Sequence, residues 1–520
     1  MFLLTNIPEI SIVPRGMSRE MSTALPTVKV LSRKLLNFVE PEEVFQHFFA
    51  EEAYAFWLDS SRVESDLSRF SFMGATNGPL SKVIKYDSKT QLVQISDAQG
   101  QTELTEDIFN YIDSEIHKMQ QHSNELPFDF NGGFVGYFGY ELKAECGANE
   151  HHVSSNPDAL FILADRLIAF DHKERCIYLV CIVPYNAPTS ASEWFDATEQ
   201  QLQNVPSIAP VEVTNNDTRT PLNFELSQSY AQYVKKIEKC KKYITEGETY
   251  EVCLTNRINI NEHFNPLVTY RILRNINPAP YSSFLKFGEL SVLCSSPERF
   301  LKIDQDRVVE AKPIKGTIAR GKNIEDDLRL AEILRTSEKD RAENLMIVDL
   351  LRNDLGLVCD IGSVHVPKLM AIESYQTVHQ LVSTIKGTLR AELTAIDCIR
   401  SAFPGGSMTG APKIRTMDYI DELETNARGI YSGAIGFLSL NGTTDLNIVI
   451  RTIIMTPEQA TVGVGGAITI LSDPEREFEE TLLKGRALVK ALTISQFGKF
   501  DKKLYTFNDP HMDSLFNKLL

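Results

Sequence analysis

Apolar and polar positions alternate most clearly in the second half of the chain. A capping-box pattern at residues 229–232 precedes apolar residues at helical spacing, and Gly247 follows them, so a helix is predicted between these points. From residue 252 to residue 260 the apolar side chains instead fall on one face of a strand. Further on, an Asn-Gly turn signal at 441–442 is flanked by strand-like residues 437–440 and 446–454, and a third strand is predicted at 461–470.

The first half of the chain is also rich in strand-like stretches. They include residues 55–58, residues 70–74 and a glycine-spaced aromatic run at 132–141. Because strands and long helices are mixed without regular βαβ alternation, the pattern predicts a two-lobed α+β fold with antiparallel sheets packed with helices.

Changes in local composition divide the chain. A stretch rich in Pro, Asn and Thr has no apolar period and is typical of a linker, and the first residues lack a sustained period as well. The predicted division is a mobile lead-in at 1–25, a first domain at 26–203, a linker at 204–222, a second domain at 223–495 and a C-terminal tail at 496–520.

Composition and charge limit the class of protein. The 520 residues carry a formal net charge of -16, which argues against a general nucleic-acid binder because such a protein needs a basic face. No apolar run approaches membrane-spanning length, and the first residues lack the basic leader and apolar core of a secretory signal. The eight cysteines are scattered without a CxxC pair, so neither zinc nor a disulfide framework is expected. These features favour a cytoplasmic protein with no nucleic-acid or membrane partner.

Lys315 has the most informative setting of any residue. Pro313 ends a strand-like stretch before it, and Gly316 after it lets backbone approach a ligand closely. A buried lysine amine can lose its proton near neutral pH and attack carbon, so Lys315 is a candidate nucleophile. The alternative is a solvated loop lysine, which is the commoner case for a single lysine.

Two pairs of carboxylates accompany Lys315. Asp340 and Glu343 lie three residues apart in a strongly helical segment, and Glu477 and Glu480 lie three apart at the start of the last long helix. Each pair therefore falls on one helix face, where like charges repel unless solvent or a cation compensates. Mg²⁺ takes oxygen ligands, and two facing helices that each offer one direct and one outer carboxylate would suit it. A solvated helix face is the alternative for either pair alone.

Three further features could bind anionic groups. Residues 403–413 place glycines and the Ser407 hydroxyl before a helix start, where free amides attract anions, although an ordinary capped turn is equally compatible. Arg451, predicted on the strand at 446–454, could pair bidentately with a carboxylate or have a structural role. The small residues of the next strand, which would let backbone amides reach a ligand, are Gly465, Gly466 and Ala467.

For two titratable residues the sequence allows both a catalytic and a structural role. Glu298 follows an apolar stretch; a partly buried carboxyl has a raised pKa and can donate a proton, but a salt bridge to Arg299 is the alternative. His379 is either a proton donor or a hydrogen-bonded core histidine.

Several long motifs, taken in order, resemble those of the chorismate-utilising enzymes. The resemblance is close over residues 230–495, and the first half resembles the companion domain of the anthranilate and aminodeoxychorismate synthases. The matching motifs are Ser296-Pro297-Glu298, Pro313-Ile314-Lys315-Gly316-Thr317, residues 343–354, the 403–413 loop, Gly433-Ala434-Ile435-Gly436 and residues 477–481.

Within this family, position 315 separates two branches. Anthranilate synthases carry alanine there and aminodeoxychorismate synthases carry lysine, so the chain is more similar to the branch that leads to 4-aminobenzoate and folate. Isochorismate and salicylate synthases have a base lysine where this chain has Glu251, which argues against water as the nucleophile. Glu251 also differs from the glutamine of well-known relatives, and its role is left open. Anthranilate synthase component I is the alternative enzyme, and a non-catalytic subunit with the same fold is the alternative of another class.

The resemblance also implies a site and its chemistry. Lys315 would attack C2 of chorismate while Glu298 protonates the departing C4 hydroxyl, and ammonia would then add at C4 and expel the lysine. This chain shows no Gly-x-Cys-x-Gly elbow of a glutaminase, so a separate glutamine amidotransferase subunit is implied as the ammonia source. The implied Mg²⁺ ligands are Glu343 and Glu480, with Asp340 and Glu477 behind them. The residues expected around the substrate are Gly316, His379, Ser407, Tyr431, Arg451, Gly465, Gly466 and Ala467.

Overall fold

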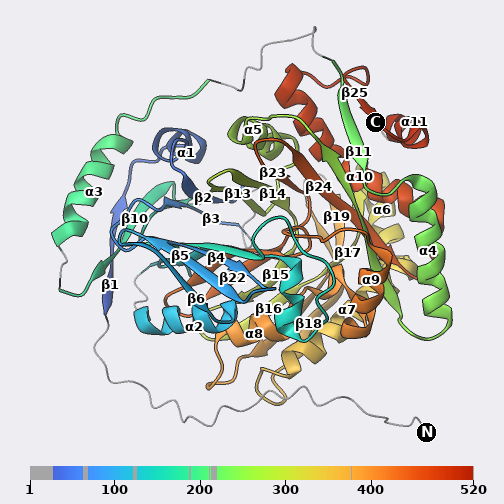
Figure 1. Cartoon of the computed structure of the whole chain (residues 1–520), viewed down its shortest axis with the longest axis horizontal. Helices are drawn as coiled ribbons and strands as arrows, with labels where there is room; N and C mark the ends of the chain where they lie inside the picture. Colours follow the sequence, from blue (N-terminus) through green and yellow to red (C-terminus); the bar gives the residue numbers. More distant parts are fainter. Residues whose placement is uncertain are drawn as a thin grey trace.

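The computed structural model describes residues 27–61, 68–120, 126–186, 189–209, 211, 220–375 and 378–518 (Figure 1). The predicted lead-in at 1–25 and part of the predicted linker lie outside these residues. Two large sheets with helices packed around them make up the molecule, so the predicted α+β class is confirmed. In the part of the chain described, no helix has the length and apolar character needed to cross a membrane.

The first sheet draws its 13 strands from both halves of the chain. They are β1 (Val28–Leu35), β2 (Tyr54–Asp59), β3 (Phe70–Ala75), β9 (Arg166–Asp171), β10 (Cys176–Pro184), β11 (Leu222–Leu226), β12 (Glu251–Ile260), β13 (Tyr281–Phe287), β14 (Leu290–Ser296), β20 (Gly410–Ala411), β23 (Thr452–Met455), β24 (Ala460–Ile468) and β25 (Tyr505–Phe507). Their order is β1-β10-β9-β3-β2-β13-β14-β23-β24-β12-β11-β25, and β20 pairs with β12. The paired strands are antiparallel except β11 and β25, which are parallel.

The second sheet has 12 strands. They are β4 (Lys82–Asp87), β5 (Leu92–Asp97), β6 (Gly100–Thr105), β7 (Gly133–Phe138), β8 (Ala159–Ala164), β15 (Arg299–Ile303), β16 (Val308–Lys312), β17 (Ile314–Ala319), β18 (His365–Ser374), β19 (Val378–Thr388), β21 (Ala434–Ser439) and β22 (Thr444–Ile448). The order β17-β19-β16-β15-β22-β21-β7-β8-β4-β5-β6, with β18 on β19, is antiparallel throughout.

Helices surround the two sheets. They are α1 (Pro41–Phe48), α2 (Ile108–Met119), α3 (Thr189–Leu202), α4 (Tyr230–Thr245), α5 (Pro266–Ile276), α6 (Ile324–Thr336), α7 (Glu338–Gly356), α8 (Ala395–Ala402), α9 (Lys413–Leu423), α10 (Pro474–Phe497) and α11 (Pro510–Lys518), with short 3-10 turns η1 (Tyr140–Cys146) and η2 (Gly406–Met408). Figure 1 shows α4, α10 and α11 grouped beside β11 and β25 at one side of the molecule. The apolar side chains beneath the helices form two large clusters.

Both sheets join the two halves of the chain. β2 pairs with β13, which places Trp57 opposite Phe284, and β7 pairs with β21. Trp57 and Phe284 are both buried. The domains predicted at 26–203 and 223–495 therefore share both sheets.

Several local predictions are confirmed. The helix predicted after residue 229 is α4, where the Ser229 hydroxyl accepts from the Gln232 N–H and the Gln232 side chain accepts from the Ser229 N–H. Gly247 follows its end with a φ of 79°, a conformation that favours glycine. The strand predicted at 252–260 is β12, and the Asn-Gly turn at 441–442 joins β21 to β22.

The single strand predicted at 446–454 is wrong. This stretch contains the end of β22 and the start of β23, which belong to different sheets. Arg451 lies between the two strands with a φ of 52°. Both strands are buried, so the apolar pattern continues where the chain passes from one sheet to the other. The sequence therefore does not indicate that the strand ends there.

Residues 496–518, the described part of the segment predicted as a C-terminal tail at 496–520, pack against the second half. β25 pairs with β11, and α11 contacts α10. Tyr505, Phe507 and Met512 are buried in the same apolar cluster as the side chains of β12 and α10.

Candidate active site

Lys315 lies on β17, at the edge of the second sheet. Gly316 follows with a φ of 86°, and the register between β17 and β19 shifts at this point. The Lys315 side chain is only 9% exposed, and its Nζ lies 2.9 Å from Glu251 Oε1 and 3.9 Å from Glu343 Oε2. The alternative of a solvated loop lysine is therefore wrong.

The protonation state of Lys315 differs from the predicted neutral amine. Burial by itself lowers the pKa of Lys315, but the charges of Glu251 and Glu343 outweigh it and raise the pKa above the ordinary value. Lys315 is thus an ammonium in this site, and the prediction of a lowered pKa is wrong. Glu251 is completely buried on β12, and nothing in its local sequence indicates that it meets Lys315.

Glu298 lies between β14 and β15 and is 6% exposed. Burial raises the pKa of Glu298 to about 7, although the charge of Lys315 acts in the opposite direction. The alternative of a salt bridge to Arg299 is wrong, because Arg299 pairs with Asp445 and Glu310. Glu298 is therefore a carboxyl that can carry a proton near neutral pH.

The two acidic pairs lie on α7 and α10, which meet at Lys339. Lys339 Nζ is 2.5 Å from Glu477 Oε1 on α10 and 3.8 Å from Glu343 Oε1 on α7. Glu480 is more exposed and pairs with Lys484 at 2.7 Å. Lysine ammonium groups therefore compensate three of the four carboxylates that the sequence assigns to Mg²⁺, namely Glu343, Glu477 and Glu480.

Asp340 lies one turn before Glu343 on α7 and packs against Gly316. A Cβ added to Gly316 would lie 2.8 Å from the Asp340 carboxyl carbon. Gly316 thus allows α7 to approach β17 closely. This packing accounts for the glycine beside Lys315, and no close approach to a ligand is needed to explain it.

The donor chemistry of the acidic cluster fits Mg²⁺. Glu343 Oε1 and Glu477 Oε2 are buried oxygens without a hydrogen-bond partner. Opposite them, a Cβ added to Gly466 would lie 3.4 Å from Lys484 Nζ, 3.6 Å from Glu477 Oε2 and 3.9 Å from Glu480 Oε1, so this glycine leaves room between the Lys484 ammonium and the carboxylates. Burial raises the pKa of Glu343 to about 7. Among the described residues no three Asp, Glu, His or Cys side chains lie close enough together to hold a metal ion. The carboxylate side chains would therefore have to move closer together to bind Mg²⁺.

The predicted anion-binding residues are placed around this cluster. The Ser407 hydroxyl, on η2, is close enough to Glu298 to lower the pKa of that carboxyl. Arg451 donates to the Lys484 carbonyl at 2.9 Å, and no carboxylate of the described chain forms an ion pair with it. A guanidinium with unused donors suits an incoming carboxylate. On β24, the Gly465 carbonyl accepts from Lys484 Nζ at 2.9 Å, next to Gly466 and Ala467.

His379 is engaged elsewhere. One of its ring nitrogens lies 2.9 Å from Asp327 Oδ1 and the other lies 2.7 Å from the Ser374 hydroxyl. The residue is buried, and both ring nitrogens are used within the protein. These contacts favour the core-histidine interpretation, and a contact with substrate stays a prediction.

Sequence reasoning missed two lysines of the site. Lys339 lies four residues before Glu343, and Lys484 lies four residues after Glu480. Spacing of four places oppositely charged side chains on one helix face, and this was the available signal.

It also missed a buried ion pair that connects three segments. Arg428 pairs with Glu424 at 2.7 Å, and it donates to the carbonyls of Met408 on η2 and Cys253 on β12. Both side chains are almost completely buried. The spacing of four between Glu424 and Arg428 could indicate their pairing, but the Met408 and Cys253 carbonyls are distant in sequence, so no local pattern predicts the rest of the network.

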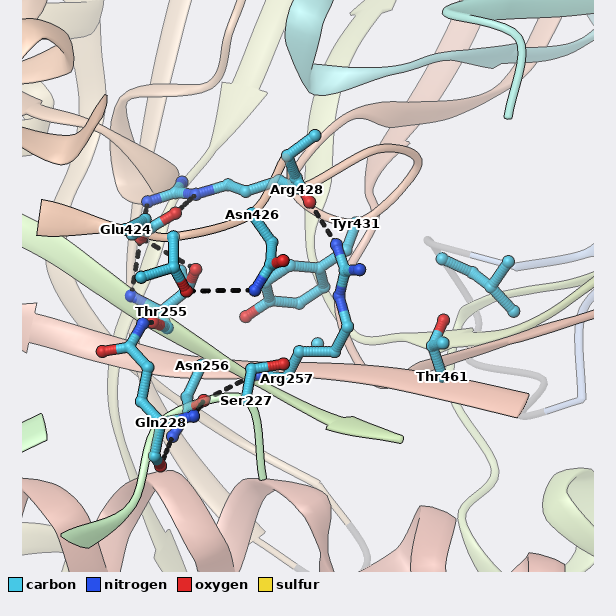
Figure 2. Close-up of a pocket in the computed structure, with 14 residues that line it drawn as sticks. Ser227, Gln228, Thr255, Asn256, Arg257, Glu424, Asn426, Arg428, Tyr431 and Thr461 are labelled. Carbon is cyan, nitrogen blue, oxygen red and sulfur yellow. Dashed lines mark hydrogen bonds and ion pairs between the residues drawn. The ribbon is translucent and has the colours of Figure 1, made fainter. Parts of the chain in front are cut away.

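A cavity of about 400 Å³, its open mouth included, adjoins Tyr431 (Figure 2). The Tyr431 ring packs over Gly463, where a Cβ would lie 2.1 Å from it. Figure 2 shows Glu424 bonded to Thr255 and Arg428 in the cavity wall. Alternate residues of a strand share a face, so Thr255 and Glu251 lie on the same side of β12. β12 therefore carries one residue of the cavity wall and one residue of the Lys315 cluster on the same face.

Comparisons with known proteins give consistent matches. The family model described as chorismate binding enzyme matches residues 67–490. The aminodeoxychorismate synthase of Streptomyces pristinaespiralis is 46% identical over 470 residues, 90% of this chain and 65% of that protein. The aminodeoxychorismate synthase component 1 of Bacillus subtilis is 37% identical, over 72% of this chain and 79% of that protein. The crystal structure of anthranilate synthase component I from Streptococcus pneumoniae matches with a TM-score of 0.69 at 33% identity, over 82% of this chain and 93% of that one.

The chain is shorter than several of its relatives. It spans between 50% and 68% of the length of four curated proteins that carry the name aminodeoxychorismate synthase and that are 43% to 46% identical to it. The matches therefore describe one part of those longer proteins.

Proposed function

This chain belongs to the family of chorismate binding enzymes, and on that premise we propose that it converts chorismate and ammonia to 4-amino-4-deoxychorismate. One observation carries the proposal: position 315, which separates the two aminating branches in the sequence analysis, holds a lysine that is buried beside a carboxylate at 2.9 Å. A lysine on the surface would not support a catalytic role. The high identity to relatives named aminodeoxychorismate synthase supports the same activity.

Lys315 is the proposed nucleophile at C2 of the substrate. Because Lys315 is an ammonium in this site, a proton must leave it before its nitrogen can attack. Glu251 Oε1 is in hydrogen-bond contact and can accept that proton, while Glu251 Oε2 has no hydrogen-bond partner. This arrangement gives Glu251 the role that the sequence left open.

Glu298 is the proposed acid at C4. Its raised pKa keeps a proton available near pH 7, and transfer of that proton lets the C4 hydroxyl leave as water. Ammonia then bonds to C4, and the bond between C2 and the Lys315 nitrogen breaks. The nitrogen of ammonia thus replaces the hydroxyl oxygen, and Lys315 is regenerated.

The remaining residues bind and orient the substrate. Arg451 has guanidinium donors for a substrate carboxylate, and Ser407 and Tyr431 supply hydroxyls beside Glu298 and the cavity. The residues that would hold Mg²⁺ are Glu343 and Glu480, with Asp340 and Glu477 behind them. When bound, Mg²⁺ would offset the negative charge of the ring carboxylate.

Ammonia would come from a separate glutamine amidotransferase subunit. The Bacillus subtilis relative, of which the chain covers 79%, is named as component 1 of a synthase, and this name supports a partner subunit. Free ammonium would replace the partner in an assay of this chain alone.

Anthranilate synthase component I is the second candidate. The match to the Streptococcus pneumoniae structure at 33% identity favours it, and the lysine at position 315 counts against it. Incubation of the chain with chorismate, Mg²⁺ and ammonium separates the two, because one enzyme makes the C4-amino product and the other makes fluorescent anthranilate.

Replacement of Lys315 tests the proposed chemistry. Lys315→Ala removes the nucleophile, so formation of the C4-amino product from chorismate, Mg²⁺ and ammonium should fall by at least about 100-fold. Mass spectrometry of a quenched wild-type reaction should also show substrate bound to the peptide that contains Lys315. Lys143→Ala is the matched control, because Lys143 is another buried lysine paired with a carboxylate, Asp421. Unchanged C4 amination by Lys315→Ala would remove the claim of a covalent step.

A further inference from the structure

Lys339 is placed where the acidic cluster needs a cation. Its Nζ lies 2.5 Å from Glu477 Oε1 on α10 and 3.8 Å from Glu343 Oε1 on α7, so one ammonium bridges the two helices. The other two lysines of the site each have a nearer carboxylate: Lys315 is held by Glu251 at 2.9 Å and lies 3.9 Å from Glu343, and Lys484 is held by Glu480. Lys339 is therefore the internal cation that joins the two carboxylates.

The acidic cluster also has buried carboxylate oxygens that no hydrogen bond satisfies, and a metal ion could use them. Glu343 Oε1 and Glu477 Oε2 are buried and form no hydrogen bond. Gly466 leaves room between the Lys484 ammonium and Glu477 Oε2, as a Cβ there would lie 3.4 Å from the first and 3.6 Å from the second. Glu477 Oε1 also accepts from the Ser472 hydroxyl at 2.6 Å, which fixes the carboxylate in place without Lys339. The carboxylates thus retain donor capacity that one ammonium does not satisfy.

Lys339 is also able to leave this position. Its side chain is 34% exposed, and in the described chain its hydrogen bond goes to Glu477 alone. By contrast, Lys484 bonds both Glu480 and the Gly465 carbonyl, and Lys315 is almost fully enclosed. Lysine carries its ammonium on a flexible four-carbon stem, so Lys339 can swing into solvent when another cation takes its place.

We propose that Lys339 is a built-in counter-ion that competes with Mg²⁺ for the acidic cluster, through the ligand Glu343 and the outer carboxylate Glu477. An ammonium and a divalent cation repel strongly at ion-pair distance in a partly buried site, so they cannot share both carboxylates. Mg²⁺ must therefore displace Lys339, and the metal-free protein keeps its helices together through Lys339. The inference deepens the proposed function, on which it rests for the identity of the metal.

Measurement of Mg²⁺ affinity without chorismate tests this competition. Isothermal titration calorimetry of the EDTA-treated, dialysed full chain should show that Lys339→Gln binds Mg²⁺ about tenfold more tightly than the wild type, within the usual range of coupling between sites. Lys339→Arg keeps the charge and should bind no more tightly than the wild type. Lys82→Gln is the matched control. Lys82 Nζ lies 3.1 Å from Glu115 Oε2 in another part of the molecule, so this substitution should leave the Mg²⁺ affinity unchanged.

Thermal denaturation gives a second readout. Lys339→Gln should have a lower Tm than the wild type in EDTA, since its carboxylates lose their cation, and Mg²⁺ should raise its Tm more than it raises that of the wild type. Equal or weaker Mg²⁺ binding by Lys339→Gln, or no Mg²⁺ binding by either protein, overturns the inference. Neither measurement uses chorismate, so failure of the proposed amination is detected separately by product analysis.

Discussion

Glu298 and Glu343 are two buried carboxyls that have the same raised pKa in different electrostatic settings. Burial raises the pKa of each to about 7. Glu343 has Lys315 and Lys339 within 4 Å, whereas none of the described lysines or arginines forms an ion pair with Glu298. The neighbouring lysine charges lower the pKa of Glu343 against the effect of burial, and Lys315 does the same for Glu298 from beyond ion-pair distance. The two carboxyls thus differ in their lysine neighbours and not in their pKa.

The pH dependence of amination should report the acid. Glu298 must be protonated to release the C4 hydroxyl, and its pKa is raised to about 7, so kcat/KM should fall as pH rises above this value. Glu298→Gln should lower kcat/KM by roughly 10²- to 10⁴-fold and should abolish the limb near pH 7. The measurement is a pH profile of product formation with ammonia, as NH₃, held constant.

A buried carboxyl outside the site provides the control for that profile. Burial raises the pKa of Asp165 to about 6, and its carboxylate accepts from the Leu80 N–H in the first half of the chain. Asp165→Asn should therefore keep the limb near pH 7. A limb that persists in Glu298→Gln would assign the titration to another group.

At the scale of elements, the buried Arg428 connects three segments around the site. It joins the end of α9 through Glu424, η2 through the Met408 carbonyl and β12 through the Cys253 carbonyl. η2 carries Ser407, and β12 carries Glu251. The position of two proposed site residues thus depends on one guanidinium that touches neither.

Removal of Arg428 should therefore cost stability and activity together. Arg428→Met leaves Glu424 buried without its cation, which should lower the free energy of unfolding by about 3–5 kcal/mol. Urea denaturation measures this loss. Arg415→Met is the control, because the exposed Arg415–Glu248 pair on α9 should contribute little that is measurable. A loss in Arg428→Met as small as that of the control would show that the network is not structurally important.

The sequence predicts elements well where one local pattern decides them. The capping box at Ser229 and the alternation in β12 rest on contacts within a few residues, and both are confirmed. The break at Arg451 was missed because burial on both sides of a sheet crossing gives one continuous apolar run. The pKa of Lys315 was predicted in the wrong direction because Glu251 is 64 residues away in sequence. Charge pairing across elements depends on tertiary structure, which residue spacing does not encode.

At the scale of the whole molecule, the two halves of the chain are joined by strand pairing in both sheets. β2 and β13 share six paired positions, and β7 and β21 share six more. The paired strands are mostly buried on both faces. Separation of the halves would expose apolar edges in each sheet, and such edges pair with other chains.

Cleavage between the halves should therefore leave the molecule intact, whereas deletion of one half should not. A protease site inserted within residues 212–219 should be cut without loss of the single peak in gel filtration or a large change in Tm, because the strand pairing holds the fragments together. Residues 220–518 produced alone should aggregate, since β13 and β21 then each lose one of their two partner strands and present an unpaired edge. The uncut insertion variant controls for the insertion itself. Separation of the fragments after cleavage, or a soluble and cooperatively folded 220–518 fragment, would show that the second half forms an independent domain and that the shared sheets are dispensable for its fold.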